Sequence, residues 1–177
     1  MSDFEIVAIE LSRLDQMRAD GADGFGNPWL PTSAAGWEPL RCCLTVAEAG
    51  APIALVCHTP WTAPSPWLEA GPVFVHADRC AGYPTPHRYP PALAASHSVL
   101  NPFHADGSRA YEHITRVAAT EDHEAALRAV LAHDEVDHLH VRSATAGCFT
   151  FAVHRRRRRQ VVAGNPRPRW PRPQDAP

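Results

Sequence analysis

The alternation of apolar and polar residues is clearest near the end of the chain, between residues 138 and 153. Apolar side chains alternate with polar ones from His138 to Arg142, and a second run follows from Cys148 to Val153 after a short segment containing Gly147. This period of two, with a short glycine-containing connection, is typical of a β-hairpin. Its predicted buried face carries Leu139, Val141, Phe149, Phe151 and Val153. Its predicted polar face, which we expect to be partly open to solvent, carries His138, His140, Arg142, Cys148 and Thr150.

Further strands are predicted over residues 4–9, 40–46, 53–57, 73–76, 97–103 and 111–119. The strongest helical pattern follows Thr120, a suitable N-cap, and places Leu127, Val130 and Leu131 on one apolar face that extends to His133. A weaker helical stretch covers residues 11–19. Strands outnumber helices, and most connections are too short for crossovers between parallel strands. The sequence therefore predicts a single α+β domain over residues 1–154, with a mainly antiparallel sheet and one principal helix packed on one face.

The composition excludes several classes of protein. With 177 residues, 45% hydrophobic and 20% charged, the chain suits one globular domain. No apolar run approaches the roughly 20 residues of a membrane helix, so we expect no membrane partner. The N-terminus is acidic, unlike a secretory signal. The five cysteines are an odd number without CxxC spacing. We therefore expect reduced thiols in a cytoplasmic protein.

The charge is distributed unevenly along the chain. Residues 155–177 carry eight arginines against one aspartate, a net charge of +7, whereas the first 154 residues carry nine arginines against 18 acidic residues, a net charge of −9. The prolines in this segment predict a disordered Arg/Pro-rich tail. Trp170 is its one aromatic residue available for base stacking, which argues against nucleic acid as a partner. A non-catalytic interaction module that uses this tail stays an alternative function.

Three segments together resemble a known family. They are Pro39-Leu-Arg41-Cys-Cys-Leu44, then Gly71-Pro-Val-Phe-Val-His76, and Val136 to Phe149 with its Gly147-Cys148-Phe149 ending. They are similar to the bacterial family called domain of unknown function 1203, over about residues 36–154. Leu40 stands where that family often has a cysteine, so a scheme that needs a thiol there does not apply to this chain. The resemblance implies a compact bacterial cytosolic domain and no particular reaction.

The polar residues of these segments suggest a site for a small anionic molecule. Arg41, Arg142 and Ser143 are the predicted ligand-binding residues, because two guanidinium groups can grip one carboxylate or phosphate. His76 and His140 are the predicted proton carriers, with Cys148 as a third catalytic candidate. The prediction includes no cofactor. Whether the protein is an enzyme, and its oligomeric state, are left open.

Other interpretations of the same residues compete with this one. The polar face of the hairpin has the ordinary pattern of a solvated sheet face. His138 and His140, about 6.6–7 Å apart along a strand, could share a metal ion with Cys148 or His76, so a His/Cys metal-binding protein is a second alternative function. Arg142 would repel a divalent cation, and no residue is assigned as a metal ligand. Cys148 also fits a small packed thiol. Cys42 and Cys43, if they lie on a strand, point to opposite faces and make a poor dithiol centre.

Overall fold

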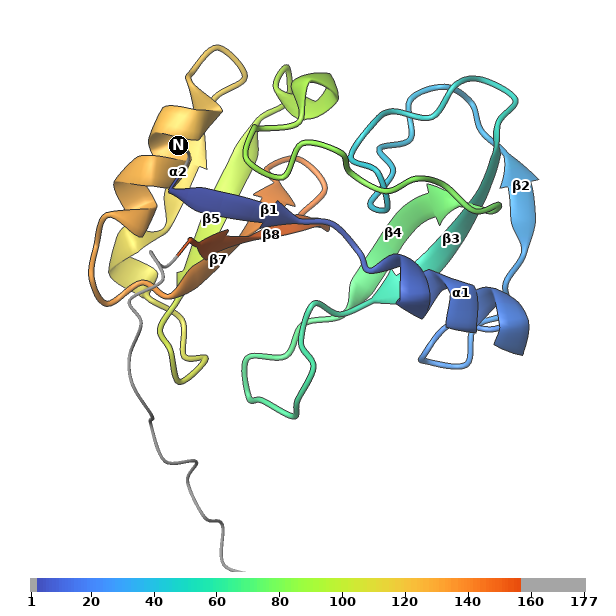
Figure 1. Ribbon diagram of the computed structural model, residues 1–177, viewed down its shortest axis with the longest axis horizontal. Coiled ribbons are helices and arrows are strands. Elements are labelled where there is room, and N and C mark those ends of the chain that lie inside the picture. Colours follow the sequence, from blue (N-terminus) through green and yellow to red (C-terminus); the bar gives the residue numbers. More distant parts are fainter. Residues whose placement is uncertain (1–2, 157–177) are drawn as a thin grey trace, which may run out of the picture.

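The computed structural model describes residues 3–156, which form two antiparallel sheets lying side by side (Figure 1). The larger sheet has five strands in the order β1-β8-β7-β5-β6, and the smaller has three in the order β2-β3-β4. The strands of the larger sheet are β1 (Phe4–Val7), β5 (Ser98–Phe103), β6 (Thr115–Val117), β7 (His138–Ser143) and β8 (Phe149–Arg155). Those of the smaller sheet are β2 (Pro31–Ser33), β3 (Pro52–His58) and β4 (Gly71–His76).

Each sheet packs against one α-helix. Helix α2 (His123–Leu131) lies on the larger sheet and places Leu127, Val130 and Leu131 in its core. Helix α1 (Leu11–Asp20) contributes Leu14 and Met17 to the core of the smaller sheet. Two short 3-10 helices cover Pro91–Leu93 and Tyr111–His113. The α+β class and the helix on one face of a mainly antiparallel sheet are confirmed.

The N-cap prediction for α2 is wrong by two residues. Asp122, not Thr120, precedes the first helical turn, and its carboxylate accepts a hydrogen bond from the backbone N–H of Ala125 at 3.0 Å. A carboxylate at this position satisfies a free N–H group and favours the positive end of the helix dipole.

The β7–β8 hairpin follows the predicted alternation up to a bulge. Leu139 pairs with Val153 and Val141 with Phe151, and all four side chains are buried on the α2 side. Arg142, however, pairs with Phe149, because the register shifts between Val141 and Arg142. A bulge adds one residue to one strand and turns the following side chains to the opposite face. Phe149 therefore lies on the histidine face, and its predicted place beside Phe151 is wrong.

The histidine face of the larger sheet is covered, which corrects the expectation of a partly open face. The loop between β3 and β4 crosses it and brings the Trp61 ring edge-on against Phe103, with 5.1 Å between ring centroids, and against His140, at 5.7 Å. His140 is 3% exposed as a result. The solvated interpretation of this face is therefore wrong for His140.

Residues 40–46 form a turn instead of the predicted strand. The Leu44 N–H donates to the carbonyl of Leu40 at 2.9 Å, and Leu44 takes a positive φ of 58°. Short bridges pair Pro39 with Val46 and Leu40 with Phe74. The apolar alternation seen in the sequence reflects burial of the turn in the smaller core, where Leu40, Cys42 and Leu44 are nearly inaccessible to solvent.

The last described strand continues one residue beyond the predicted boundary at His154. The Arg155 guanidinium donates to the backbone carbonyls of His133 and Val136, at 2.7 and 3.0 Å, and so anchors the end of β8. The rest of the predicted tail of residues 155–177, from residue 157 onward, lies outside the described residues. Within residues 3–156, none of the helices is long and apolar enough to cross a membrane.

Candidate functional site

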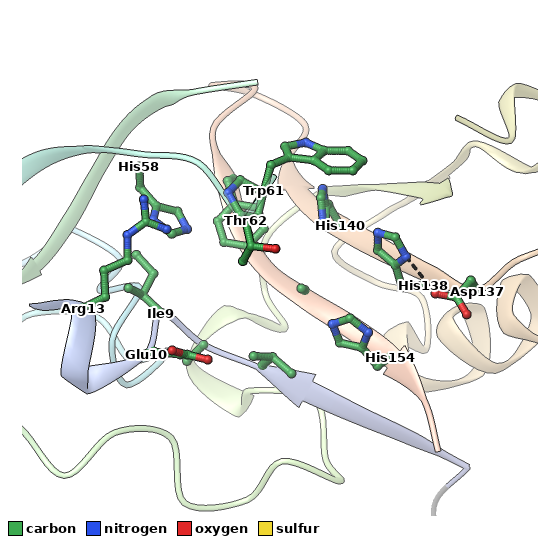
Figure 2. Close-up of a pocket in the computed structure, with 15 residues that line it drawn as sticks. Ile9, Glu10, Arg13, His58, Trp61, Thr62, Asp137, His138, His140 and His154 are labelled. Atoms are coloured by element: carbon green, nitrogen blue, oxygen red, sulfur yellow. Dashed lines mark hydrogen bonds and ion pairs between the residues drawn. The ribbon is translucent and has the colours of Figure 1, made fainter. Parts of the chain in front are cut away.

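A pocket of about 470 Å³ lies on the histidine face, between the larger sheet and the end of the smaller one (Figure 2). Four imidazole rings, from His58, His138, His140 and His154, surround it together with the side chain of Trp61. Its remaining lining residues are Val7, Ala8, Ile9, Glu10, Arg13, Pro60, Thr62, Asp137, Phe149 and Ala152. We call this the histidine pocket. Its walls come from β1, α1, the end of β3, the β3–β4 loop, β7 and β8, so the contact between the two sheets forms it.

Two of the four imidazoles are deeply buried and uncharged. His58 is 5% exposed and His140 is 3% exposed, and the Nδ1 atom of each lacks a hydrogen-bond partner within residues 3–156. Burial lowers the pKa of both to about 3, and the positive charge of Arg13 adds to this for His58. For His140, His138 and Arg142 act in the same direction. Unpaired buried polar atoms are rare in folded proteins and often mark a binding site.

His138 is held by a carboxylate and by two flat rings. Its Nδ1 lies 3.2 Å from Oδ2 of Asp137, which fixes Nδ1–H as the donor to the carboxylate. The ring stacks on Phe103, with centroids 5.2 Å apart, and on His154, at 5.4 Å. Burial lowers the pKa of His138, and the bond to Asp137 partly offsets this. The arrangement leaves Nε2 as the proton acceptor of a neutral, oriented imidazole.

Arg13 is the guanidinium group of this pocket. It projects from α1, and its Nη1 donates to the backbone carbonyl of Thr59 at 2.9 Å. Among residues 3–156, no carboxylate oxygen lies within 4 Å of it, although Glu10 lines the same pocket. An anionic group that entered the pocket would therefore meet a cation without an acidic partner.

Two further arginines, Arg109 and Arg142, act on His140 through their charges and are already paired. Glu69, on the β3–β4 loop, accepts hydrogen bonds from both Arg109 and Arg142. The Nε atoms of both arginines are buried without a partner within the described residues. The charges of Arg142 and Arg109 both oppose protonation of His140, which places this pair close to the pocket wall.

Of the six predicted site residues, His140 alone lines the histidine pocket. Arg142, Ser143 and Cys148 all bond the backbone of the β7–β8 loop. Arg142 Nη1 donates to the Gly147 carbonyl, Ser143 Oγ accepts from the Ala146 N–H, and the Cys148 thiol faces the Ala146 carbonyl. These bonds shape the loop.

Arg41 connects the two sheets. Its Nε donates to the Phe149 carbonyl of β8 at 2.6 Å, while its backbone N–H donates to the Phe74 carbonyl of β4 at 2.8 Å. The residue is 4% exposed, and this burial lowers its pKa to about 10. Arg41 and Arg142 thus bond the same Gly147–Phe149 segment. Their partners there are backbone carbonyl oxygens, where the prediction expected a bound carboxylate or phosphate.

His76 lies in a separate cluster. Its Nδ1 is 3.5 Å from the Cys42 sulfur and 3.6 Å from the Cys43 sulfur. The turn places both thiols on the same side, so the prediction that they point apart is wrong. The hydrogen bond between the two thiols lowers the pKa of Cys43 to about 5 and raises that of Cys42. Within residues 3–156, His138 and His140 share no compact group of metal-ligating atoms with His76 or Cys148.

Sequence reasoning missed Arg13 and His58, and it treated His138 only as a solvated or metal-ligating residue. A signal existed for His58, which ends a predicted apolar strand and precedes a proline-rich loop. Arg13 carried no such signal, because its position beside the pocket depends on how α1 packs under the smaller sheet.

The chain belongs to a family of proteins of unknown function, DUF1203, whose sequence pattern it matches over residues 37–155. This confirms the resemblance drawn from the three motifs. No curated protein and no solved structure matches the chain. The family match covers β3 to β8, and therefore most of the histidine pocket, but not Glu10 and Arg13.

Proposed function

We propose that this chain binds a small anionic molecule in the histidine pocket, with Arg13 as the residue that contacts the anionic group. The observation that carries the proposal is a guanidinium without an acidic partner beside imidazoles that stay neutral. The cavity volume lies within the range of about 300–1,000 Å³ typical of small-molecule sites. The His58 and His140 rings line the same pocket, and their Nδ1 atoms are buried without a partner within the described residues.

The same site is suited to acid–base chemistry. His138 is neutral, is oriented by Asp137 and presents Nε2 as an acceptor, which is the arrangement of a base positioned by a third group. A proton taken from the bound molecule would convert His138 to an imidazolium, and the Asp137 carboxylate would stabilise it. His140, which is more deeply buried, suits hydrogen bonding to the molecule in its neutral form.

The proposal transfers the anion contact from Arg41 and Arg142 to Arg13. Arg41 and Arg142 already bond carbonyl groups, and Arg142 also bonds Glu69. A guanidinium engaged in this way has fewer free N–H donors for a ligand than a guanidinium with a single backbone partner, such as that of Arg13. Ser143 and Cys148 have no ligand contact in this proposal.

The test titrates the full chain with each of two probes, inorganic phosphate and succinate. Binding is monitored by the NMR signals of the histidine rings. We expect at least one probe to shift the His138 and His140 signals. Arg13→Ala should weaken that binding by about 10–100-fold, because a charge-assisted contact is worth roughly 1.5–3 kcal/mol. Arg116→Ala, at an exposed arginine of β6, is the matched control and should bind as the wild type does.

Two results would contradict the proposal. One is the absence of any histidine shift with either probe at concentrations that leave the protein folded. The other is equal binding by Arg13→Ala and the wild type, which would place the anion elsewhere, most simply on Arg142 and Arg109. Glu69→Gln would then tighten binding, because it removes the carboxylate that occupies those two arginines.

A further inference from the structure

Three cysteines and one histidine meet at the edge of the smaller sheet, away from the histidine pocket. The ligand atoms of Cys42, Cys43, His76 and Cys80 all lie within 4.8 Å of one another. Cys42 and Cys43 are buried, whereas His76 and Cys80 are partly exposed. All five cysteines of the chain are free thiols, and Cys57 and Cys148 lie outside this group.

The local backbone brings these four residues together from two segments. The turn that follows Leu40 carries the adjacent pair Cys42 and Cys43, and Leu44 completes it with a positive φ of 58°. His76 is the last residue of β4, and Cys80 follows four residues later. The bridge between Leu40 and Phe74 holds the turn against β4, which places the two segments side by side.

We propose that Cys42, Cys43, His76 and Cys80 bind one zinc ion. Zinc in proteins prefers four thiolate and imidazole ligands in tetrahedral geometry, and three cysteines with one histidine are a common structural set. With Zn–S bonds of about 2.3 Å, tetrahedral geometry separates two sulfur atoms by about 3.8 Å. The sulfur–sulfur distances therefore need to contract by about an ångström or less, within the reach of side-chain rotation. The His76 Nδ1 already lies 3.5 and 3.6 Å from the Cys42 and Cys43 sulfurs, close to the separation that zinc would impose.

The bonds around the cluster are those expected of a metal–thiolate site. The backbone N–H of His76 donates to the Cys42 sulfur at 3.3 Å, and the Thr45 hydroxyl lies 3.1 Å from the Cys43 sulfur. Such outer hydrogen bonds stabilise the negative charge on the sulfur and fix the ligand orientation. Because four protein ligands fill the coordination sphere, the zinc would be structural, without an open position for a substrate.

Arg18 of α1 stabilises the segment that connects His76 to Cys80. Its guanidinium donates to three successive carbonyls, those of His76, Ala77 and Asp78, at 3.1, 2.8 and 2.8 Å. The remaining nitrogen pairs with Asp15 at 2.9 Å. The ligand segment is therefore held in place before any metal binds, which lowers the entropic cost of binding.

The zinc would also stabilise the contact between the two sheets. Arg41, which precedes Cys42, bonds β4 through its backbone and β8 through its side chain. Metal ligation on the adjacent residues would fix this turn and with it the connection to β8. The proposed site is independent of the histidine pocket, because the two share no residue.

A second group of potential ligands, His113, His133 and Glu135, is weaker as a metal site. His133 and Glu135 are exposed, and the two imidazole rings stack on each other with centroids 3.8 Å apart. Glu135 already bonds His113 at 2.7 Å. This group lacks thiolates and burial, and we assign no metal to it.

The test measures the metal content of the full chain by elemental mass spectrometry. The protein is purified without a polyhistidine tag and without added metal. We expect about one zinc per chain, retained through gel filtration. Cys80→Ser should lose most of it, and because Cys80 is partly exposed this variant should still fold. Cys148→Ser and Cys57→Ser, which remove thiols outside the cluster, are the matched controls and should keep their zinc.

Cobalt substitution identifies the ligands. Tetrahedral Co²⁺ with thiolate ligands absorbs in the visible range and shows a thiolate-to-metal charge-transfer band in the near ultraviolet. At a Co²⁺ concentration that saturates the weakened site, Cys80→Ser should show about two thirds of that band, because two of three thiolates remain. His76→Asn should retain the band and bind the metal more weakly.

Three results would overturn the proposal. The first is a wild-type protein without zinc that also fails to bind Co²⁺ when its thiols are reduced. The second is stoichiometric zinc in Cys80→Ser equal to that in Cys148→Ser. The third is iron in place of zinc, which would make the cluster a different kind of centre.

Discussion

Replacing Phe151 with alanine is expected to lower the free energy of unfolding by roughly 3–5 kcal/mol. Phe151 is fully buried on the α2 side of the larger sheet, where it pairs with Val141 and meets the Tyr89 ring edge-on, with 5.5 Å between centroids. The substitution removes a large apolar side chain and leaves a cavity that a sheet cannot close by moving one strand.

The measurement is urea denaturation followed by circular dichroism. Phe25→Ala serves as the control, because Phe25 is 49% exposed in a loop, and it should change stability by no more than about 0.5 kcal/mol. A loss for Phe151→Ala as small as that of the control would mean that this strand does not form the core of the larger sheet.

Phe149 shows how far sequence periodicity can be trusted in this fold. Alternation correctly assigns Leu139, Val141, Phe151 and Val153 to the α2 face, because a strand of regular register turns each second side chain the same way. Phe149 departs from the pattern because a bulge inserts a residue at the start of β8. No local feature of the sequence marks that bulge, since its position depends on the pairing with β7.

The turn at residues 40–46 shows a second limit. Its apolar residues alternate as in a strand, yet the chain reverses there and buries them in the core of the smaller sheet. The proposed zinc site depends on this reversal, because a strand would separate the Cys42 and Cys43 sulfurs. The sequence has no CxxC motif that would indicate the cluster, because its other two members, His76 and Cys80, come from the end of β4 and the segment after it.

The histidine pocket could be predicted only in part. His140 was identified because imidazoles are uncommon on a strand face, and the family motif drew attention to the same segment. Arg13 and His58 come from the first 58 residues and reach the pocket through the packing of one sheet against the other. Contacts of this kind depend on tertiary structure, and one sequence does not specify them.

Lowering the pH from 7 to 5 is expected to destabilise this protein by about 4 kcal/mol through His58 and His140. In the folded chain the pKa of each imidazole is about 3, whereas in the unfolded chain it is near 6.5. The unfolded state therefore binds more protons at every pH between these values, and stability falls as the pH decreases below about 6.5. At pH 5 each residue contributes a loss of about 2 kcal/mol.

The surroundings of the two rings explain why they resist protonation. Burial is the main cause for both rings. The positive charges of Arg142 and Arg109 near His140, and of Arg13 near His58, add to it, because an imidazolium at either position would lie beside like charge. Carboxylates such as Asp23, whose pKa is lowered chiefly by hydrogen bonds that outweigh its burial, lose their contribution only below about pH 4. The interval between pH 7 and 5 thus leaves the carboxylates out. The Cys43 thiol, whose pKa is lowered to about 5, adds a loss of the same sign that is common to the wild type and the histidine variants.

The experiment compares urea denaturation of the wild type, His58→Gln, His140→Gln and the double variant at pH 7 and pH 5. Glutamine keeps a polar group but does not titrate, so each single variant should remove about 2 kcal/mol of the pH-dependent loss and the double variant about 4 kcal/mol. Thermal unfolding at the two pH values gives an independent measure of the same differences. If both single variants keep the full dependence of the wild type, His58 and His140 are not buried as neutral rings, and the pocket they define is not formed in solution.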